Sequence, residues 1–147
     1  MANNILSATA LAATSEAIAF GCAAGLDMAV MLQVLNASSG RSTASSEKFP
    51  EHVLTARYAS GFTNSLMAKD VRLYLREAAE LAGPAAPGAV TAAVWEAFAA
   101  GEPGADFTRI YPFVAGTEDG GEGSDGADGT ACAPSSRTAS ESRTTWG

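Results

Sequence analysis

The 147-residue sequence predicts an all-α fold, and three observations support this. The chain has 32 alanines but only 11 aromatic residues, a balance that favours close helix packing over a β-sandwich. Apolar residues recur at helical spacing in several segments, and no segment has a convincing strand alternation. Glycine, proline and aspartate stand where these segments begin or end, which is typical of helix boundaries.

The first expected helix is strongly apolar and runs from Ile5 to Ala24, with Gly25 as a left-handed stop. Its hydropathy resembles that of a membrane span, but it is rich in alanine and carries several polar residues, so a buried helix is favoured. These polar residues are Ser7, Thr9, Thr14, Ser15 and Glu16. Asp27 is suited to cap a second helix that ends at the turn 36–40.

The middle of the chain is expected to contain a short helical turn over 42–48, which Pro50 interrupts. A long helix follows Gly61-Phe62 and ends at Gly83-Pro84. A fourth helix is expected from about Gly88 to Ala100. Asp106 is suited to cap a last short helix.

The composition changes near Gly116, which divides the chain into a helical domain over 1–116 and a tail over 117–147. The tail is rich in Gly, Ser, Thr, Asp and Glu, and Trp146 is its one large apolar residue. It carries a net charge of −4 out of the −7 of the whole chain. We expect such a segment to be disordered, because it cannot bury enough apolar surface to offset its ordering entropy.

Charge and composition exclude several classes of function. The net charge is −7 and no lysine or arginine precedes Arg41, which disfavours nucleic acid as a partner and removes the basic region of a secretory signal. His52 is expected to be a solvated surface residue in a polar loop. Cys22 and Cys132 have no metal-binding spacing, so we expect free thiols in a cytoplasmic protein.

Three polar segments attract attention, and each has a structural alternative. The pair Asn3-Asn4 opens a very apolar helix, where it could cap backbone N–H groups. The segment 36–41 offers hydroxyls and one guanidinium suited to a carboxylate ligand, or is an ordinary turn. Lys69-Asp70 is either functional or an exposed charge pair. From these residues alone, the sequence indicates only a helical domain.

The order and spacing of six short motifs carry more information than each motif alone. The motifs are Ala2-Asn3-Asn4, Ser15-Glu16-Ala17, Ala24-Gly25-Leu26-Asp27, the segment 35–42, Gly61-Phe62 and Leu66-Met67-Ala68-Lys69-Asp70. In this order they closely resemble the C-terminal helical domain of the 3-hydroxyisobutyrate dehydrogenase (β-hydroxyacid dehydrogenase) family, over roughly residues 1–115. The resemblance implies a helical bundle like the C-terminal domain of 6-phosphogluconate dehydrogenase.

The resemblance also implies roles for individual residues. The family pattern Lys-x-x-Asn-Asn matches its asparagines to Asn3 and Asn4, and its catalytic lysine would fall one residue before Met1. Asn4 would be the active-site asparagine that hydrogen-bonds the substrate. The substrate side would be formed by Asn4, Ser38, Ser39 and Gly40, and the cofactor side by Phe62 and Lys69. No metal is implied.

The expected function is therefore that of the helical half of an NAD(P)-dependent 3-hydroxyacid dehydrogenase or semialdehyde reductase. Its partners would be a small hydroxyacid or semialdehyde, NAD or NADP, and a Rossmann domain, and the assembly would be a homo-oligomer away from membranes. The chain would be a fragment, inactive alone, because the family lysine is missing. The alternative is a stand-alone, non-enzymatic helical dimerisation or binding module. A third alternative, an imine-reducing member of the same superfamily, ranks below both of these.

Overall fold

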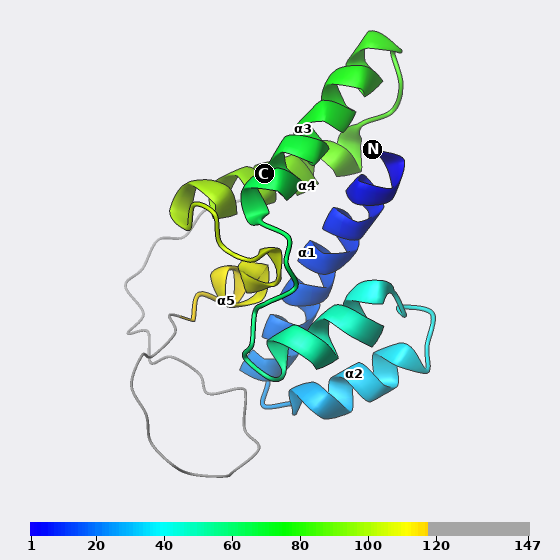
Figure 1. Cartoon of the computed structure of the whole chain (residues 1–147). Coiled ribbons are helices and arrows are strands. Elements are labelled where there is room, and N and C mark those ends of the chain that lie inside the picture. Colours follow the sequence, from blue (N-terminus) through cyan, green and yellow to red (C-terminus); the bar gives the residue numbers. More distant parts are fainter. Residues whose placement is uncertain (118–147) are drawn as a thin grey trace, which may run out of the picture.

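A computed structural model describes residues 1–117. Within this range the chain is helical and contains no strand, only an isolated bridge between Thr63 and Asp106 (Figure 1). The elements are α1 (Ala2–Ala23), α2 (Met28–Asn36), the π-helix η1 (Ala44–Val53), α3 (Asn64–Glu80), α4 (Ala86–Gly101), the short 3-10 helix η2 (Phe107–Arg109) and α5 (Ile110–Ala115). The predicted all-α class is confirmed for this range. Almost all of the predicted tail lies outside the described residues.

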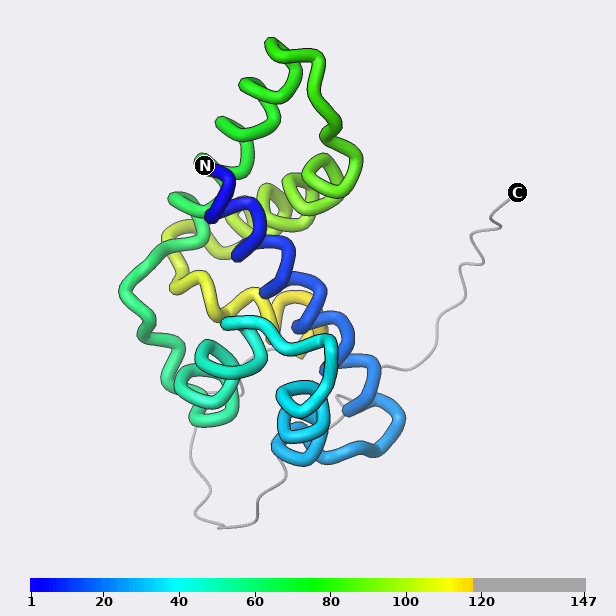
Figure 2. Tube along the Cα trace, turned by 90° about the vertical axis from the view of Figure 1, so that its right-hand side faces the viewer, coloured from blue at the N-terminus to red at the C-terminus, as the bar shows by residue number. Residues whose placement is uncertain are grey.

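Helix α1 organises the fold. It runs diagonally through the molecule, with α3 and α4 beside its N-terminal half and α2 and η1 beside its C-terminal half (Figures 1 and 2). Its core-facing side is formed by Ile5, Ala8, Leu11, Ser15, Ile18 and Gly21. Of the described helices, α1 is the one long and apolar enough to cross a bilayer, a test that core helices also pass. In this fold it packs against every other α-helix.

Large side chains from the later helices fill the space around α1. Trp95 and Phe98 of α4, Phe49 of η1 and Ile110 of α5 are fully buried. The indole Nε1 of Trp95 donates a hydrogen bond to the carbonyl of Ala8, 3.1 Å away. This bond fixes α4 against α1, because a buried indole N–H needs an acceptor.

Several predicted helix boundaries are confirmed. Asp27 caps α2 by accepting a hydrogen bond from the amide of Val30 at 2.9 Å. Gly25, with φ of +85°, adopts the left-handed conformation expected after the first helix. Helix α3 begins after Thr63, whose side chain caps it, and ends just before Gly83.

The helical turn predicted over 42–48 is confirmed from Ala44 onward, but the predicted interruption at Pro50 is wrong. The segment is a ten-residue π-helix that passes through Pro50. Proline normally stops an α-helix because its ring collides with the carbonyl four residues back and it has no N–H. The wider π turn instead bonds residues five apart, as from the amide of Leu54 to the carbonyl of Phe49 at 2.8 Å. This geometry tolerates Pro50.

The expectation of free thiols is also wrong, since Cys22 is disulfide-bonded. The expectation rested on residue spacing and on an assumed reducing compartment, and neither fixes how close two sulfur atoms lie in the fold. Cys132 lies outside the described residues.

Candidate functional site

The first turn of α1 meets the second turn of α3 through a side-chain hydrogen bond. Nδ2 of Asn4 donates to Oδ2 of Asp70 at 2.7 Å, across 66 positions in the sequence. Because a carboxylate can only accept, the amide nitrogen of Asn4 must face Asp70. Its Oδ1 faces away and accepts a longer bond, 3.3 Å, from Nδ2 of Asn3. Asn4 therefore presents an oriented carbonyl oxygen.

Lys69 precedes Asp70 on α3 and is exposed. With Arg72, Leu73 and Arg76 it lines an open hollow of about 420 Å³. The hydrogen bond between Asn4 and Asp70 thus places the Asn3-Asn4 and Lys69-Asp70 motifs side by side.

Phe62 lies in the segment that leads into α3. Its ring is half-buried and meets the ring of Phe107 edge-on, with centroids 5.6 Å apart. Its carbonyl accepts a hydrogen bond of 2.8 Å from the amide of Phe107, and two residues later the amide of Asn64 donates to the carbonyl of Ala105 at 2.8 Å. The position of Phe62 is therefore set by the segment before η2.

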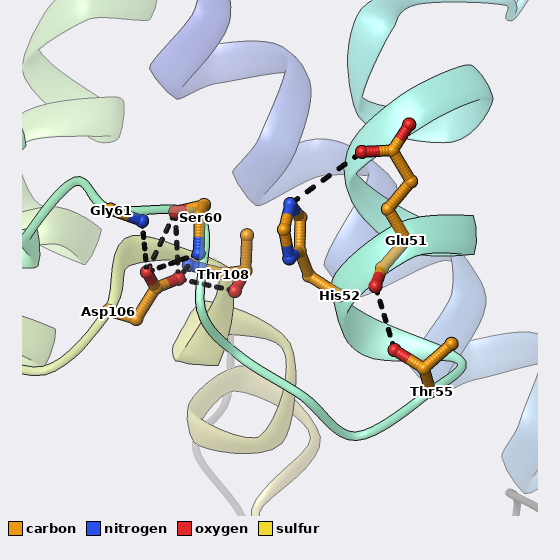
Figure 3. A network of polar contacts seen from close by, with 7 residues as sticks. All are labelled: Glu51, His52, Thr55, Ser60, Gly61, Asp106 and Thr108. Carbon is orange, nitrogen blue, oxygen red and sulfur yellow. Dashed lines mark hydrogen bonds and ion pairs between the residues drawn. The ribbon is translucent and has the colours of Figure 1, made fainter.

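Asp106 lies at the centre of the hydrogen bonds that join the segment before α3 to η2 (Figure 3). Its carboxylate accepts hydrogen bonds from the amide and hydroxyl of Ser60, the amide of Gly61, and the amide and hydroxyl of Thr108. Partial burial acts to raise the pKa of Asp106, but the hydrogen bonds from Thr108 and Ser60 outweigh it, so the pKa lies below its ordinary value. The cap of the last short helix is confirmed, but the link to Ser60 and Gly61 has no local signal because these residues lie 46 and 45 positions from Asp106.

Ser38, Ser39 and Gly40 are exposed in the connection between α2 and η1. The hydroxyl of Ser38 donates to the carbonyl of Val34 at 2.7 Å, and its own carbonyl accepts from the amide of Arg41 at 3.3 Å. Within residues 1–117, no hydrogen bond or ion pair joins this turn to Asn4 or Lys69. The substrate role of these residues stays a prediction.

His52 does not lie in a solvated loop. It is part of η1, its side chain is 16% exposed, and Nε2 lies 3.8 Å from Oε2 of Glu51 (Figure 3). Its Nδ1 is buried and has no hydrogen-bond partner among the described residues. The error follows from that for Pro50, since the helix was expected to end before this residue. No cluster of metal-binding side chains occurs in the part of the chain that the structure describes.

Comparison with known proteins identifies the family of the chain. Residues 1–114 match the family model described as the NAD-binding domain of NADP-dependent 3-hydroxyisobutyrate dehydrogenase. The human mitochondrial 3-hydroxyisobutyrate dehydrogenase is 32% identical over 119 residues, which cover 76% of this chain and 35% of that protein. The Pseudomonas aeruginosa 3-hydroxyisobutyrate dehydrogenase is 32% identical over 125 residues, covering 79% and 42%.

A relative with another substrate in its name also matches. The 2-(hydroxymethyl)glutarate dehydrogenase of Eubacterium barkeri is 33% identical over 78 residues, which cover 53% of this chain and 26% of that protein. In each of these comparisons the matched region is less than half the length of the relative. The matches support an oxidoreductase family that uses a nicotinamide cofactor. The chain belongs to the 3-hydroxyisobutyrate dehydrogenase family, as its C-terminal helical domain.

Proposed function

We propose that this chain forms the substrate-contacting and cofactor-contacting half of an NAD(P)-dependent dehydrogenase that acts on a small 3-hydroxyacid or the corresponding semialdehyde. The observation that carries the proposal is the 2.7 Å hydrogen bond between Asn4 and Asp70. It joins two motifs that the family resemblance assigns to the same cleft. A Rossmann domain would close the other side of that cleft.

Asn4 would orient the reacting hydroxyl. Its amide nitrogen is committed to Asp70, and among residues 1–117 only Asn3 donates to its Oδ1, over 3.3 Å. That oxygen is an acceptor for an alcohol O–H. Fixing the direction of the O–H bond places its proton toward a general base. In the family pattern this base is the lysine that precedes the two asparagines.

The residues on α3 fit a nicotinamide dinucleotide, because Lys69 is an exposed cation without an ion pair within residues 1–117 and the dinucleotide is an anion. When bound, the nicotinamide ring supplies the hydride acceptor. Phe62, whose segment is held by hydrogen bonds to Asp106, would form an apolar wall that excludes water.

For the substrate carboxylate, the Ser39 hydroxyl and the Arg41 guanidinium would be donors, since the Ser38 hydroxyl already donates to Val34.

A fusion protein tests this proposal. The chain is joined to the dinucleotide-binding part of the Pseudomonas aeruginosa relative, and NADH or NADPH formation is followed with 3-hydroxyisobutyrate. Asn4→Ala should lower kcat on the order of 10²-fold with little change in cofactor affinity, because it removes orientation of the hydroxyl. Gln33→Ala removes an exposed amide on α2 and serves as the control. Unchanged kcat in Asn4→Ala would contradict the proposal.

A second candidate is a stand-alone dimerisation module, and an exposed apolar surface favours it. Leu26, Val30 and Val34 are each more than half exposed and line a hollow of about 440 Å³ between α1 and α2. Apolar surface of this kind is typical of protein contacts. A dimer mass in solution that Val34→Glu converts to a monomer mass, with no hydroxyacid turnover by the fusion protein, would favour this candidate.

A further inference from the structure

The C-terminal end of α1 carries a disulfide. Cys22 stands in the last turn of the helix, its side chain is half-buried, and its sulfur is disulfide-bonded. The hydroxyl of Tyr111 on α5 donates a hydrogen bond to Sγ of Cys22 over 3.7 Å. Burial raises the pKa of Tyr111, so the phenol remains a protonated donor at neutral pH. The disulfide therefore lies against α5, the last helix of the described residues.

The place where the chain leaves α5 indicates a partner for this sulfur. The sequence contains two cysteines, and Cys132 follows the last described residue, Thr117, by 15 positions. The amide of Thr117 donates to the carbonyl of Pro112 at 3.1 Å, so the chain departs beside the residue that contacts Cys22. A segment of this length can extend over about 50 Å. A return to Cys22 is therefore within its reach without any rearrangement of the helices.

An apolar hollow opens at the same end of α1. It lies between α1 and α2, has a volume of about 440 Å³, and is lined in part by Ile18, one helical turn before Cys22. Leu26, Val30 and Val34 also line it, and each is more than half exposed. One turn of helix rises about 5 Å. A segment bonded to Cys22 would therefore begin at the edge of this hollow.

We propose that a disulfide between Cys22 and Cys132 straps residues 131–134 of this chain over the apolar hollow, and that reduction of the bond releases them. The strap has the sequence Ala-Cys-Ala-Pro, whose hydrocarbon side chains suit an apolar surface. The chain itself is favoured over a second copy as the occupant. Its attachment at Thr117 raises the effective concentration of the strap far above that of a separate molecule.

Release of the strap is a two-electron reduction. A dithiol reductant attacks one sulfur, forms a mixed disulfide and then closes to its own disulfide, which leaves Cys22 and Cys132 as thiols with one proton each. Because Cys22 is half-buried rather than enclosed in the core, a small dithiol can reach the bond in the folded chain. The helices keep their own core around Trp95 and Phe98. Reduction should therefore uncover the hollow without unfolding them.

Peptide mapping of the unreduced, alkylated 147-residue chain tests the connection. Trypsin should release Cys22 within residues 1–41 and Cys132 within residues 110–137, because arginines provide the flanking cleavage sites. We expect the two peptides to form one species with two hydrogens fewer than their sum, and to separate after treatment with dithiothreitol. Alkylated Cys132 in the unreduced chain, or a disulfide-linked dimer on a non-reducing gel, would overturn the proposal.

Amide shifts of the ¹⁵N-labelled chain test the cover and its release. Dithiothreitol should shift the amides of residues 26–35 while the far-UV circular dichroism stays unchanged. Cys132→Ser removes the partner thiol without touching the described helices, so it should show the reduced spectrum and lose all response to dithiothreitol. Ser135→Ala changes a neighbouring hydroxyl but keeps both cysteines, and it should respond as the wild-type chain does.

Two results would overturn the strap. Shifts confined to the amides around Cys22 would show that the hollow is not covered. A bond that dithiothreitol reduces only after unfolding in urea would be a permanent staple rather than a releasable strap. Neither result depends on hydride transfer, so failure of this inference is distinct from failure of the dehydrogenase function.

Discussion

Replacing Asp106 by asparagine should destabilise the fold at neutral pH. The carboxylate accepts from the amide of Ser60 at 2.7 Å and from that of Gly61 at 3.1 Å through Oδ2, and from the amide of Thr108 at 3.0 Å through Oδ1. Asparagine can keep the Thr108 bond with its oxygen, but its NH₂ group then faces two N–H donors. Two backbone bonds at about 1 kcal/mol each give an expected loss of about 2 kcal/mol in the free energy of unfolding.

The loss should depend on pH. Because the pKa of Asp106 is lowered in the folded state, its ionised form stabilises the fold fully above the unfolded pKa, near 4. That stabilisation disappears as the pH falls through the lower folded pKa. The difference between the wild-type chain and Asp106→Asn should therefore shrink steadily below about pH 4, where a protonated Asp106 resembles asparagine in shape and donors.

Urea unfolding followed by far-UV circular dichroism, at pH 7 and at steps down to pH 2.5, measures this difference. Asp27→Asn is the matched control. It also exchanges a helix-capping aspartate, but the exposed Asp27 accepts one backbone bond, from Val30, and asparagine caps equally well. We expect a change below about 0.5 kcal/mol there. Equal stability of Asp106→Asn and wild type at pH 7, or a difference that stays constant down to pH 2.5, would refute the reasoning.

Three more outcomes are expected. Trp95→Phe should lower the free energy of unfolding by about 2 kcal/mol in urea titrations, because the buried carbonyl of Ala8 loses its donor and a small cavity forms. Gly61→Ala should lower the thermal midpoint through about 1 kcal/mol of left-handed strain at φ +84°, and retention of the midpoint would contradict this. In the fusion protein, Asp70→Ala should reduce kcat as strongly as Asn4→Ala, because both remove the hydrogen bond that orients Asn4. Asp70→Asn keeps an acceptor and should retain more activity. Equal losses in the two Asp70 variants would argue against the positioning role.

Helix boundaries could be predicted from the sequence where a single local residue decides them. The cap at Asp27 and the left-handed turn at Gly25 depend on residues within one turn of each boundary. The helix interruption predicted at Pro50 was wrong, because the effect of a proline depends on whether the chain forms an α or a π turn. In the π-helix, Phe49 and Val53 on either side of Pro50 are both buried in the core, an arrangement that local sequence rules do not describe.

The candidate site likewise contains residues that local motifs predict and residues that only the folded chain brings together. The roles of Asn4 and Lys69 are predicted from motifs and stay predictions, and the structure adds that Asp70 accepts a hydrogen bond from the amide of Asn4. The link from Asp106 to Ser60 could not be predicted, because the two residues are 46 positions apart and nothing in the segment between them encodes their distance. Side-chain pairs of this kind follow from the fold as a whole.

The central position of α1 has a consequence for how the protein is made. It is synthesised before the helices it packs against, and these include α5, which ends at Ala115. At a synthesis rate of about 5–20 residues per second, α1 waits roughly 5–20 s for that last partner. During this time its core-facing side has no complete docking surface. Codon changes that slow translation between α2 and α5 should therefore raise aggregation during synthesis while leaving the stability of the finished domain unchanged.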